Sequence, residues 1–284
     1  MAHLIIYSNE AYEHMVHALV ASRSYAGAEE HTIVFYMVGY ESDINYPNMI
    51  KRRWDPQIER ENFQFYKPHV MLQSLEFEGE LIYIDTDILL GKRFNPSSLV
   101  YDLSHPVACI GPLEYVFLWN VTPDGETIKY DESILMDYLS VGEKTTQYLW
   151  TSMLSYSRES RDFLQEWCSV VDNSYFRRDD KVSHYMPFGD ETAFNVIMWR
   201  RKHTYCLPRL FMNTTVFDTL QKVEQSEDYS YFQRSDGNLQ PPKEVYERCD
   251  DSGMVQFYHG VKEHSEIIKV VSWMLAGKKS VYLD

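Results

Sequence analysis

The sequence predicts an α/β fold with a mostly parallel central sheet flanked by helices. The first 38 residues alternate an apolar run, an amphipathic segment and a second apolar run, which is the pattern of a β-α-β unit. A compact apolar run at 81–84 directly precedes two aspartates, as at the carboxyl end of a buried parallel strand. The 284 residues, 44% of them apolar, suffice for a large core, so we expect one domain, 1–284, with elaborations.

The elements expected in the first 110 residues follow from hydrophobic periodicity. Strands are expected over 3–7, 31–38, 81–84 and 107–110, and helices over 11–25 and 66–76. Pro68 suits the first turn of the second helix. The charged stretch 41–62, which contains Pro47 and Pro56, is expected to be an irregular loop or short helices.

The remaining residues are less regular. The polar stretch 120–147 is expected to be a loop, followed by an apolar strand over 148–156. Helical periodicity is present in three later segments, 158–171, 191–201 and 264–276, and short strands are expected over 205–207 and 254–258. The helix over 158–171 should bury Phe163, Leu164, Trp167 and Val171.

The segment Asp85-Thr86-Asp87 is the strongest chemical signal. In an extended backbone residues i and i+2 point the same way, so Asp85 and Asp87 would converge while Thr86 points away. Two like charges this close repel unless a cation lies between them. Carboxylate oxygens suit Mn²⁺ or Mg²⁺, which makes the triplet a candidate metal site. The alternative is a surface turn with two solvated acids.

Composition excludes several classes of function. The net charge is −15 and there is no run of Lys or Arg, so binding to a nucleic-acid backbone is not expected. The four cysteines form no C-x-x-C pair and are expected to be free thiols in a reducing compartment. The chain has neither a signal-peptide pattern nor an apolar segment of membrane-spanning length. We therefore expect a cytoplasmic protein without a membrane span.

Several motifs occur in an order that resembles the GT-A fold glycosyltransferases, most closely glycosyltransferase family 8, which includes glycogenin-like and galactosyltransferase-like enzymes. They are IIYSNEAY, Lys67 at the start of the helix before YIDTDILL, GDETAFN and HGVK. The similarity covers residues 3 to about 265. The chain departs from the family at three places: Leu149-Trp150-Thr151-Ser152 replaces an Asn-x-Gly turn, Glu191 replaces a frequent Gln, and His259 and Lys262 are only three residues apart.

The resemblance implies a GT-A fold with a nucleotide-binding half, 1–110, and an acceptor-side half, 111–284, closed by a C-terminal helix. It implies a metal-dependent, retaining transfer of a hexose from a UDP-sugar to a hydroxyl of a saccharide, protein or small molecule. The implied ligands of Mn²⁺ (or Mg²⁺) are Asp85, Asp87 and His259. The residues implied to bind the donor are Tyr7, Asn9, Tyr12, Lys67, Asp85, Thr86 and Lys262. Those implied in catalysis are Asp190, Glu191 and Lys67, with a carboxylate as a candidate nucleophile.

Other interpretations remain open. The chain could be a non-catalytic GT-A-like protein that binds a glycan or a partner, or an inverting transferase in which Asp190 or Glu191 serves as the base. A sugar-nucleotide pyrophosphorylase-like enzyme is disfavoured, because SNEAYEH lacks the glycine-rich cationic loop that such an enzyme needs. Asp190 could be a helix N-cap, Lys67 a solvated lysine and Tyr12 a core residue.

Overall fold

The computed structural model describes residues 1–56, 63–110, 119–121, 127–129, 132–173, 189–207, 212–214 and 253–256. The chain divides into two compact units, each assembled from separated segments. Unit 1 comprises Met1–Pro56, Ile84–Leu99 and Leu210–Asp284, and unit 2 comprises Gln57–Tyr83 and Val100–Arg209. The helix expected over 264–276 lies outside the described residues.

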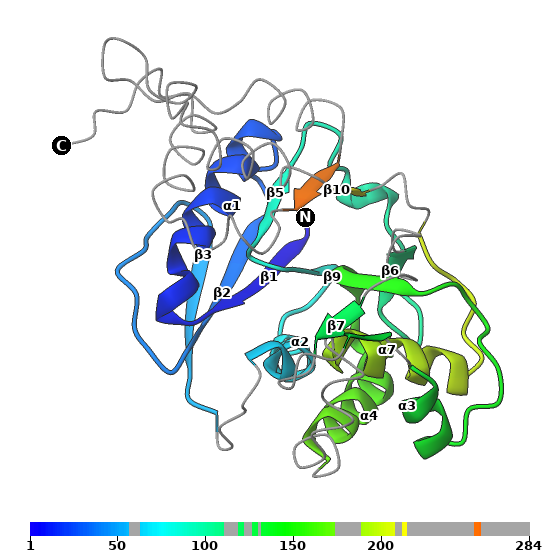
Figure 1. The fold of residues 1–284 in the computed structure, drawn as a ribbon. Coiled ribbons are helices and arrows are strands. Elements are labelled where there is room, and N and C mark those ends of the chain that lie inside the picture. Colours follow the sequence, from blue (N-terminus) through cyan, green and yellow to red (C-terminus); the bar gives the residue numbers. More distant parts are fainter. Residues whose placement is uncertain are drawn as a thin grey trace, which may run out of the picture. The chain divides into compact units, whose positions relative to one another are not determined.

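Unit 1 is built on a parallel β-α-β unit. Strand β1 (His3–Ser8) pairs in parallel with β2 (Thr32–Val38), and helix α1 (Glu13–Tyr25), preceded by the short helix η1 (Glu10–Tyr12), connects them. Figure 1 shows β1, β2 and β3 side by side with α1 beside them. All but the first residue of β1 and of β2 are buried, as a sheet covered on both faces requires.

The third strand of unit 1 was not expected. Strand β3 (Met49–Trp54) pairs in parallel with β2, so the prediction of a loop or short helices over 41–62 is wrong for these residues. Lys51, Arg52 and Arg53 are exposed at the centre of this strand. An edge strand does not need the apolar pattern by which buried strands are recognised.

Unit 1 also contains a small three-stranded sheet. Strand β5 (Ile88–Leu90) pairs antiparallel with β11 (Met254–Gln256), and β11 pairs in parallel with β10 (Met212–Thr214). The Leu90 N–H donates to Ser22 Oγ in α1 over 2.8 Å, and the Gly91 N–H donates to the Gly253 carbonyl over 2.9 Å. These bonds fix the chain directly after the aspartate triplet to the rest of unit 1.

Unit 2 is centred on strand β9 (Leu149–Tyr156), in which all eight residues are buried. It pairs antiparallel with β6 (Val107–Ile110), with a register shift between Val107 and Cys109. The helices of the unit are η2 (Phe63–Tyr66), α2 (Lys67–Ser74), α3 (Ser133–Tyr138), η5 (Arg158–Ser160), α4 (Arg161–Asp172) and α7 (Gly189–Arg200). Helices α2, α4 and α7 pack in sequence beside one another, and α7 packs on β9 (Figure 1).

The amphipathic pattern of α4 correctly predicts the core of unit 2. The four residues expected to face inward are buried, namely Phe163, Leu164, Trp167 and Val171. The rings of Phe163 and Trp167 each lie 5.1 Å from the ring of Phe194 in α7, both tilted relative to it. Tilted aromatic pairs of this kind add to the stability gained from burial.

The polar stretch 120–147 is more regular than expected. It contains part of an antiparallel pair, β7 (Trp119–Val121) with β8 (Thr127–Lys129), and then helix α3. The expectation of a plain loop is therefore wrong for these residues.

The hydrogen-bonded strand order of the main sheet is β3-β2-β1-β4-β9-β6, where β4 is Leu81–Ile84. This order and the flanking helices confirm the α/β fold with a mostly parallel central sheet. Among the described residues no helix is long and apolar enough to cross a bilayer.

Candidate functional site

The Asp85-Thr86-Asp87 triplet follows β4, whose four residues are all buried. The triplet is a turn, in which the Ile88 N–H donates to the Asp85 carbonyl over 3.2 Å. The prediction that the backbone stays extended here is wrong, because the chain turns to begin β5. Strand alternation therefore does not set the directions of the two carboxylates.

Burial separates the two aspartates. Asp87 is only 5% exposed, whereas Asp85 and Thr86 are half-buried. The alternative of two solvated acids is therefore wrong for Asp87, whose withdrawal from water is costly unless other groups compensate. By donor chemistry, the two carboxylates fit Mg²⁺ or Mn²⁺. The described residues contain no group of three His, Cys, Asp or Glu side chains placed to hold a metal ion, and the predicted residues His259 and Lys262 lie outside them.

Of the residues expected at the nucleotide, Tyr7 lies near the end of β1, Asn9 is the N-cap of η1 and Tyr12 is the last residue of η1. Tyr7 is buried, and the Asn9 side chain caps η1 by accepting a hydrogen bond from the Tyr12 N–H over 3.2 Å. Tyr12 is 37% exposed, so its assignment to the core is wrong. An exposed ring is a requirement for stacking on a base, and the stacking role stays a prediction.

In unit 2 the structure brings Lys67 and Asp190 together. Lys67 begins α2 and Asp190 is the second residue of α7, which makes the N-cap interpretation of Asp190 wrong. Lys67 Nζ lies 2.9 Å from Asp190 Oδ2, and the two side chains are 6% and 3% exposed. The same ammonium lies 5.4 Å from the centroid of the Tyr83 ring. Lys67 is therefore a buried, ion-paired cation rather than a solvated one.

Glu191 joins this pair through Thr151 in β9. Glu191 Oε2 accepts hydrogen bonds from the Thr151 N–H over 3.0 Å and from the Thr151 hydroxyl over 3.3 Å. Lys67 Nζ donates to that hydroxyl over 3.2 Å. We call the four residues Lys67, Thr151, Asp190 and Glu191 the lysine–carboxylate cluster. Its two acidic residues lie in the first turn of α7, where the helix dipole favours negative charge.

Two further side chains anchor the start of α7. Asn195 Oδ1 accepts from the Leu149 N–H over 2.7 Å, and Asn195 Nδ2 donates to the carbonyls of Leu149 and Glu191 over 2.8 and 2.9 Å. The Trp167 indole N–H donates to the Asp190 carbonyl over 2.9 Å. Because β9, α4 and α7 all hold this turn, the two carboxylates are kept in fixed positions.

The charge of Glu191 reaches a neighbouring thiol. Burial raises the pKa of Cys109 in β6 to about 12, and the Glu191 carboxylate contributes to this rise. The described cysteines, Cys109, Cys168 and Cys206, form no disulfide, as expected. At neutral pH the Cys109 thiol is protonated and acts as a buried apolar group.

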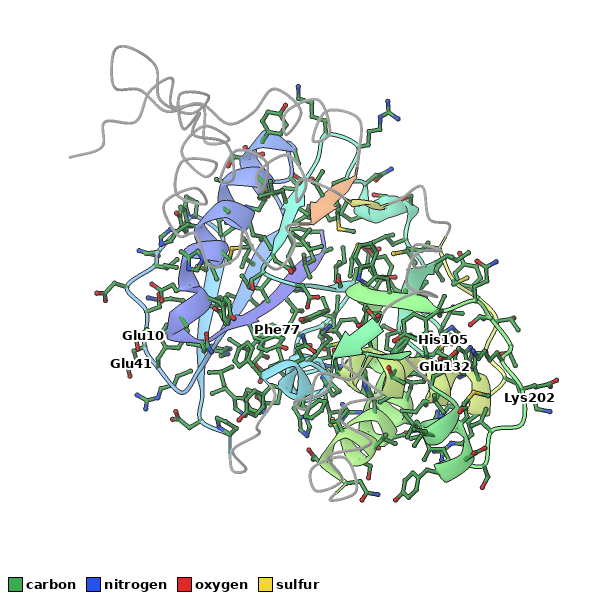
Figure 2. All side chains as sticks on the ribbon, viewed as in Figure 1. Glu10, Glu41, Phe77, His105, Glu132 and Lys202 are labelled. Carbon is green, nitrogen blue, oxygen red and sulfur yellow. The ribbon has the colours of Figure 1, made fainter. Side chains whose placement is uncertain are left out.

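Sequence patterns did not identify Thr151, Asn195 or a histidine pair as part of the polar interior of unit 2. His105, labelled in Figure 2, stacks on His203 with ring centroids 4.1 Å apart and an angle of 21° between the planes. Burial and the adjacent His203 lower the pKa of His105 to about 4. The GDETAFN motif does contain Asn195. No motif connects the two histidines, which are brought together only by the fold.

Comparison with known proteins identifies the fold. No protein-family model and no curated protein matches the chain. A solved structure, the apo form of the WbbM bifunctional glycosyltransferase, matches with a TM-score of 0.56 and 12% sequence identity. The fold is a glycosyltransferase fold. The match covers 98% of this chain and 51% of that one, so the chain spans about half the length of WbbM. At this identity the likeness establishes the GT-A-type fold alone and does not single out family 8.

Proposed function

We propose that this chain is a glycosyltransferase that moves a hexose from a UDP-sugar to an acceptor hydroxyl with the help of Mn²⁺ or Mg²⁺. The observation that supports this most is the buried Asp87 in an aspartate turn directly after a buried strand. In open α/β sheets ligands bind beyond the carboxyl ends of the strands. The glycosyltransferase fold and the buried carboxylates in the first turn of α7 are consistent with the same chemistry.

In this proposal Asp85 and Asp87, with His259, hold the divalent cation, while Tyr7, Asn9, Tyr12 and Thr86 contact the nucleoside. The cation would neutralise the charge that develops on the departing diphosphate. Lys262 would add fixed positive charge near the phosphates. Asp85 and Thr86, half-buried in the turn, remain accessible to a ligand.

Lys67, Asp190 and Glu191 are the proposed catalytic residues. One retaining route uses a carboxylate nucleophile on one face of the sugar, and Asp190 presents a buried carboxylate whose Oδ2 lies 2.9 Å from Lys67 Nζ. Glu191 presents a carboxylate held by two hydrogen bonds. Near-normal transfer by Glu191→Gln would eliminate a required Glu191 nucleophile. Inversion of the anomeric configuration in the product would instead assign one of the two acids as the base.

The donor site is tested by thermal unfolding with UDP in Mn²⁺ and in EDTA. A ligand that binds only the folded state stabilises it by about 2.7 kcal/mol at one hundred times Kd. We expect UDP to stabilise the wild type with Mn²⁺ only, and Asp87→Ala to abolish this shift. The matched control is Asp55→Ala, which removes an aspartate that is 60% exposed in unit 1. The proposal is wrong if UDP gives no shift, or if the two variants respond alike.

A second candidate function, a non-catalytic glycan- or partner-binding protein, is favoured by one observation. Lys67 and Asp190 form an ion pair in the interior, as purely structural ion pairs do. Hydrolysis of UDP-glucose and UDP-galactose in Mn²⁺ discriminates the two. A transferase releases UDP slowly without an acceptor and loses this activity in Asp190→Asn, whereas a binding protein releases none.

A further inference from the structure

Within the lysine–carboxylate cluster, Thr151 contacts Lys67 and Glu191 through three of its polar atoms. It is completely buried in β9. Its N–H and hydroxyl both reach Glu191 Oε2, while Lys67 Nζ lies 3.2 Å from its hydroxyl and 3.4 Å from its carbonyl. One residue therefore contacts both the cation and one of the acids.

Donor and acceptor chemistry fixes the direction of these hydrogen bonds. An ammonium can only donate, so the Thr151 hydroxyl accepts from Lys67. The single proton of that hydroxyl then remains for Glu191 Oε2, which accepts it over 3.3 Å. Lys67 therefore donates to the Thr151 hydroxyl, and this hydroxyl donates to Glu191. Removing the hydroxyl alone would break this chain of hydrogen bonds.

We propose that Thr151 is a positioning residue, whose hydroxyl and N–H hold the Glu191 carboxylate in the orientation that sugar transfer uses. This inference rests on the proposed function. Catalytic groups must be held to within about 0.5 Å of their productive geometry, and a flexible Glu side chain needs partners to achieve this. Thr151 contacts Glu191 and Lys67 rather than reacting atoms, so its effect is exerted through them.

The simpler alternative is that Thr151 only fills space in β9 and satisfies its own hydroxyl. Thr151→Val keeps the shape and removes the hydroxyl, whereas Thr151→Ser keeps the hydroxyl and removes the methyl group. The matched control is Ser155→Ala on the same strand, which removes a buried hydroxyl that donates to the Val100 carbonyl over 2.7 Å. A space-filling role predicts that Val is tolerated and Ser is not; a positioning role predicts the reverse.

Two measurements on the full chain test the proposal. The first is hydrolysis of UDP-glucose and UDP-galactose with Mn²⁺. We expect Thr151→Val to lower kcat about 10- to 100-fold, the range that follows from losing a hydrogen bond to a charged group, with KM for the donor unchanged. Thr151→Ser should restore kcat, and Ser155→Ala should leave it unchanged. The second is the ¹³C carboxyl resonance of Glu191 in glutamate-labelled protein, assigned by its loss in Glu191→Gln.

The two measurements separate the inference from the proposed function. A Glu191 resonance that moves in Thr151→Val, but not in Thr151→Ser or Ser155→Ala, supports the positioning of Glu191 by the Thr151 hydroxyl. If no UDP-sugar is hydrolysed while the resonance behaves in this way, the proposed function alone is overturned. An unmoved resonance in Thr151→Val overturns the positioning role. Equal loss of kcat in the Val and Ser variants also overturns it. Circular dichroism of each folded variant excludes unfolding as the cause.

Discussion

The Lys67–Asp190 pair makes a quantitative prediction about buried charge. The two atoms are 2.9 Å apart and the side chains are 6% and 3% exposed. At an effective dielectric constant of roughly 20, their attraction at this distance is about 6 kcal/mol, part of which the loss of hydration offsets. Removing one partner strands the other charge in the interior, which costs about 3–5 kcal/mol.

A double-mutant cycle measures this effect. We expect Lys67→Met and Asp190→Leu each to lower the free energy of unfolding by about 3–5 kcal/mol, and the double variant to lose far less than their sum. The assay is urea unfolding followed by circular dichroism. The coupling energy between Lys67 and Asp190 should reach at least about 2 kcal/mol, because each single variant leaves the charge of the other residue without its partner.

The chain contains a matched control for burial. Arg53 Nε lies 2.9 Å from Asp55 Oδ2, the same distance, but these side chains are 51% and 60% exposed. Exposed pairs contribute only about 0.2–1 kcal/mol. The argument is refuted if the Lys67–Asp190 coupling is no larger than that of Arg53→Met with Asp55→Leu, because burial would then add nothing.

Three further predictions concern stability. The pKa of His105 is lowered to about 4, so the unfolded chain binds a proton that the folded chain excludes, and stability should fall by about 3 kcal/mol between pH 6.5 and 4. His105→Phe should reduce this dependence of the free energy of unfolding on pH, measured by urea titrations at each pH. If the dependence is unchanged, the assignment of the loss of stability to His105 is wrong. Gly189→Ala places a Cβ 2.8 Å from the Phe65 ring and should cost about 1–3 kcal/mol, recovered in part by Phe65→Leu and measured as Tm. Asn195→Ala leaves the Leu149 N–H and carbonyl without their side-chain partners and should cost about 2–4 kcal/mol in urea, so a loss under about 1 kcal/mol would show that water replaces the amide.

Regular hydrophobic patterns made most of the fold predictable. The runs in β1, β2, β4 and β9 are mostly apolar, and the structure buries nearly all of their residues. Strand β3 was missed because its central residues are charged and exposed. The turn at the aspartate triplet was missed because the extended backbone of the strand over 81–84 was expected to continue through the two aspartates, whereas the chain turns there and passes from β4 into β5.

The candidate site was predictable as residue types but not as contacts. Motif positions pointed to Lys67, Asp190 and Glu191, and the structure pairs Lys67 with Asp190 directly and links Lys67 to Glu191 through Thr151. The pairing depends on how β9 lies against α2 and α7, which no local pattern encodes. Thr151 lies in the segment 149–152, which the sequence marked only as a departure from the Asn-x-Gly turn. In the structure this segment places the Thr151 hydroxyl beside Lys67 and Glu191.

The exposed cations of β3 have a consequence for how the protein behaves at high concentration. An edge strand presents unpaired N–H and carbonyl groups on which a strand from another molecule can grow. Strand β3 is the outermost strand of its sheet and carries Lys51, Arg52 and Arg53 in succession. Arg53 is paired with Glu41 and Asp55, so two such edges approaching each other would bring together chiefly the charges of Lys51 and Arg52. The charged strand β3 thus occupies the edge of the sheet, where pairing with a strand of another molecule could begin, and its cations oppose aggregation through that edge.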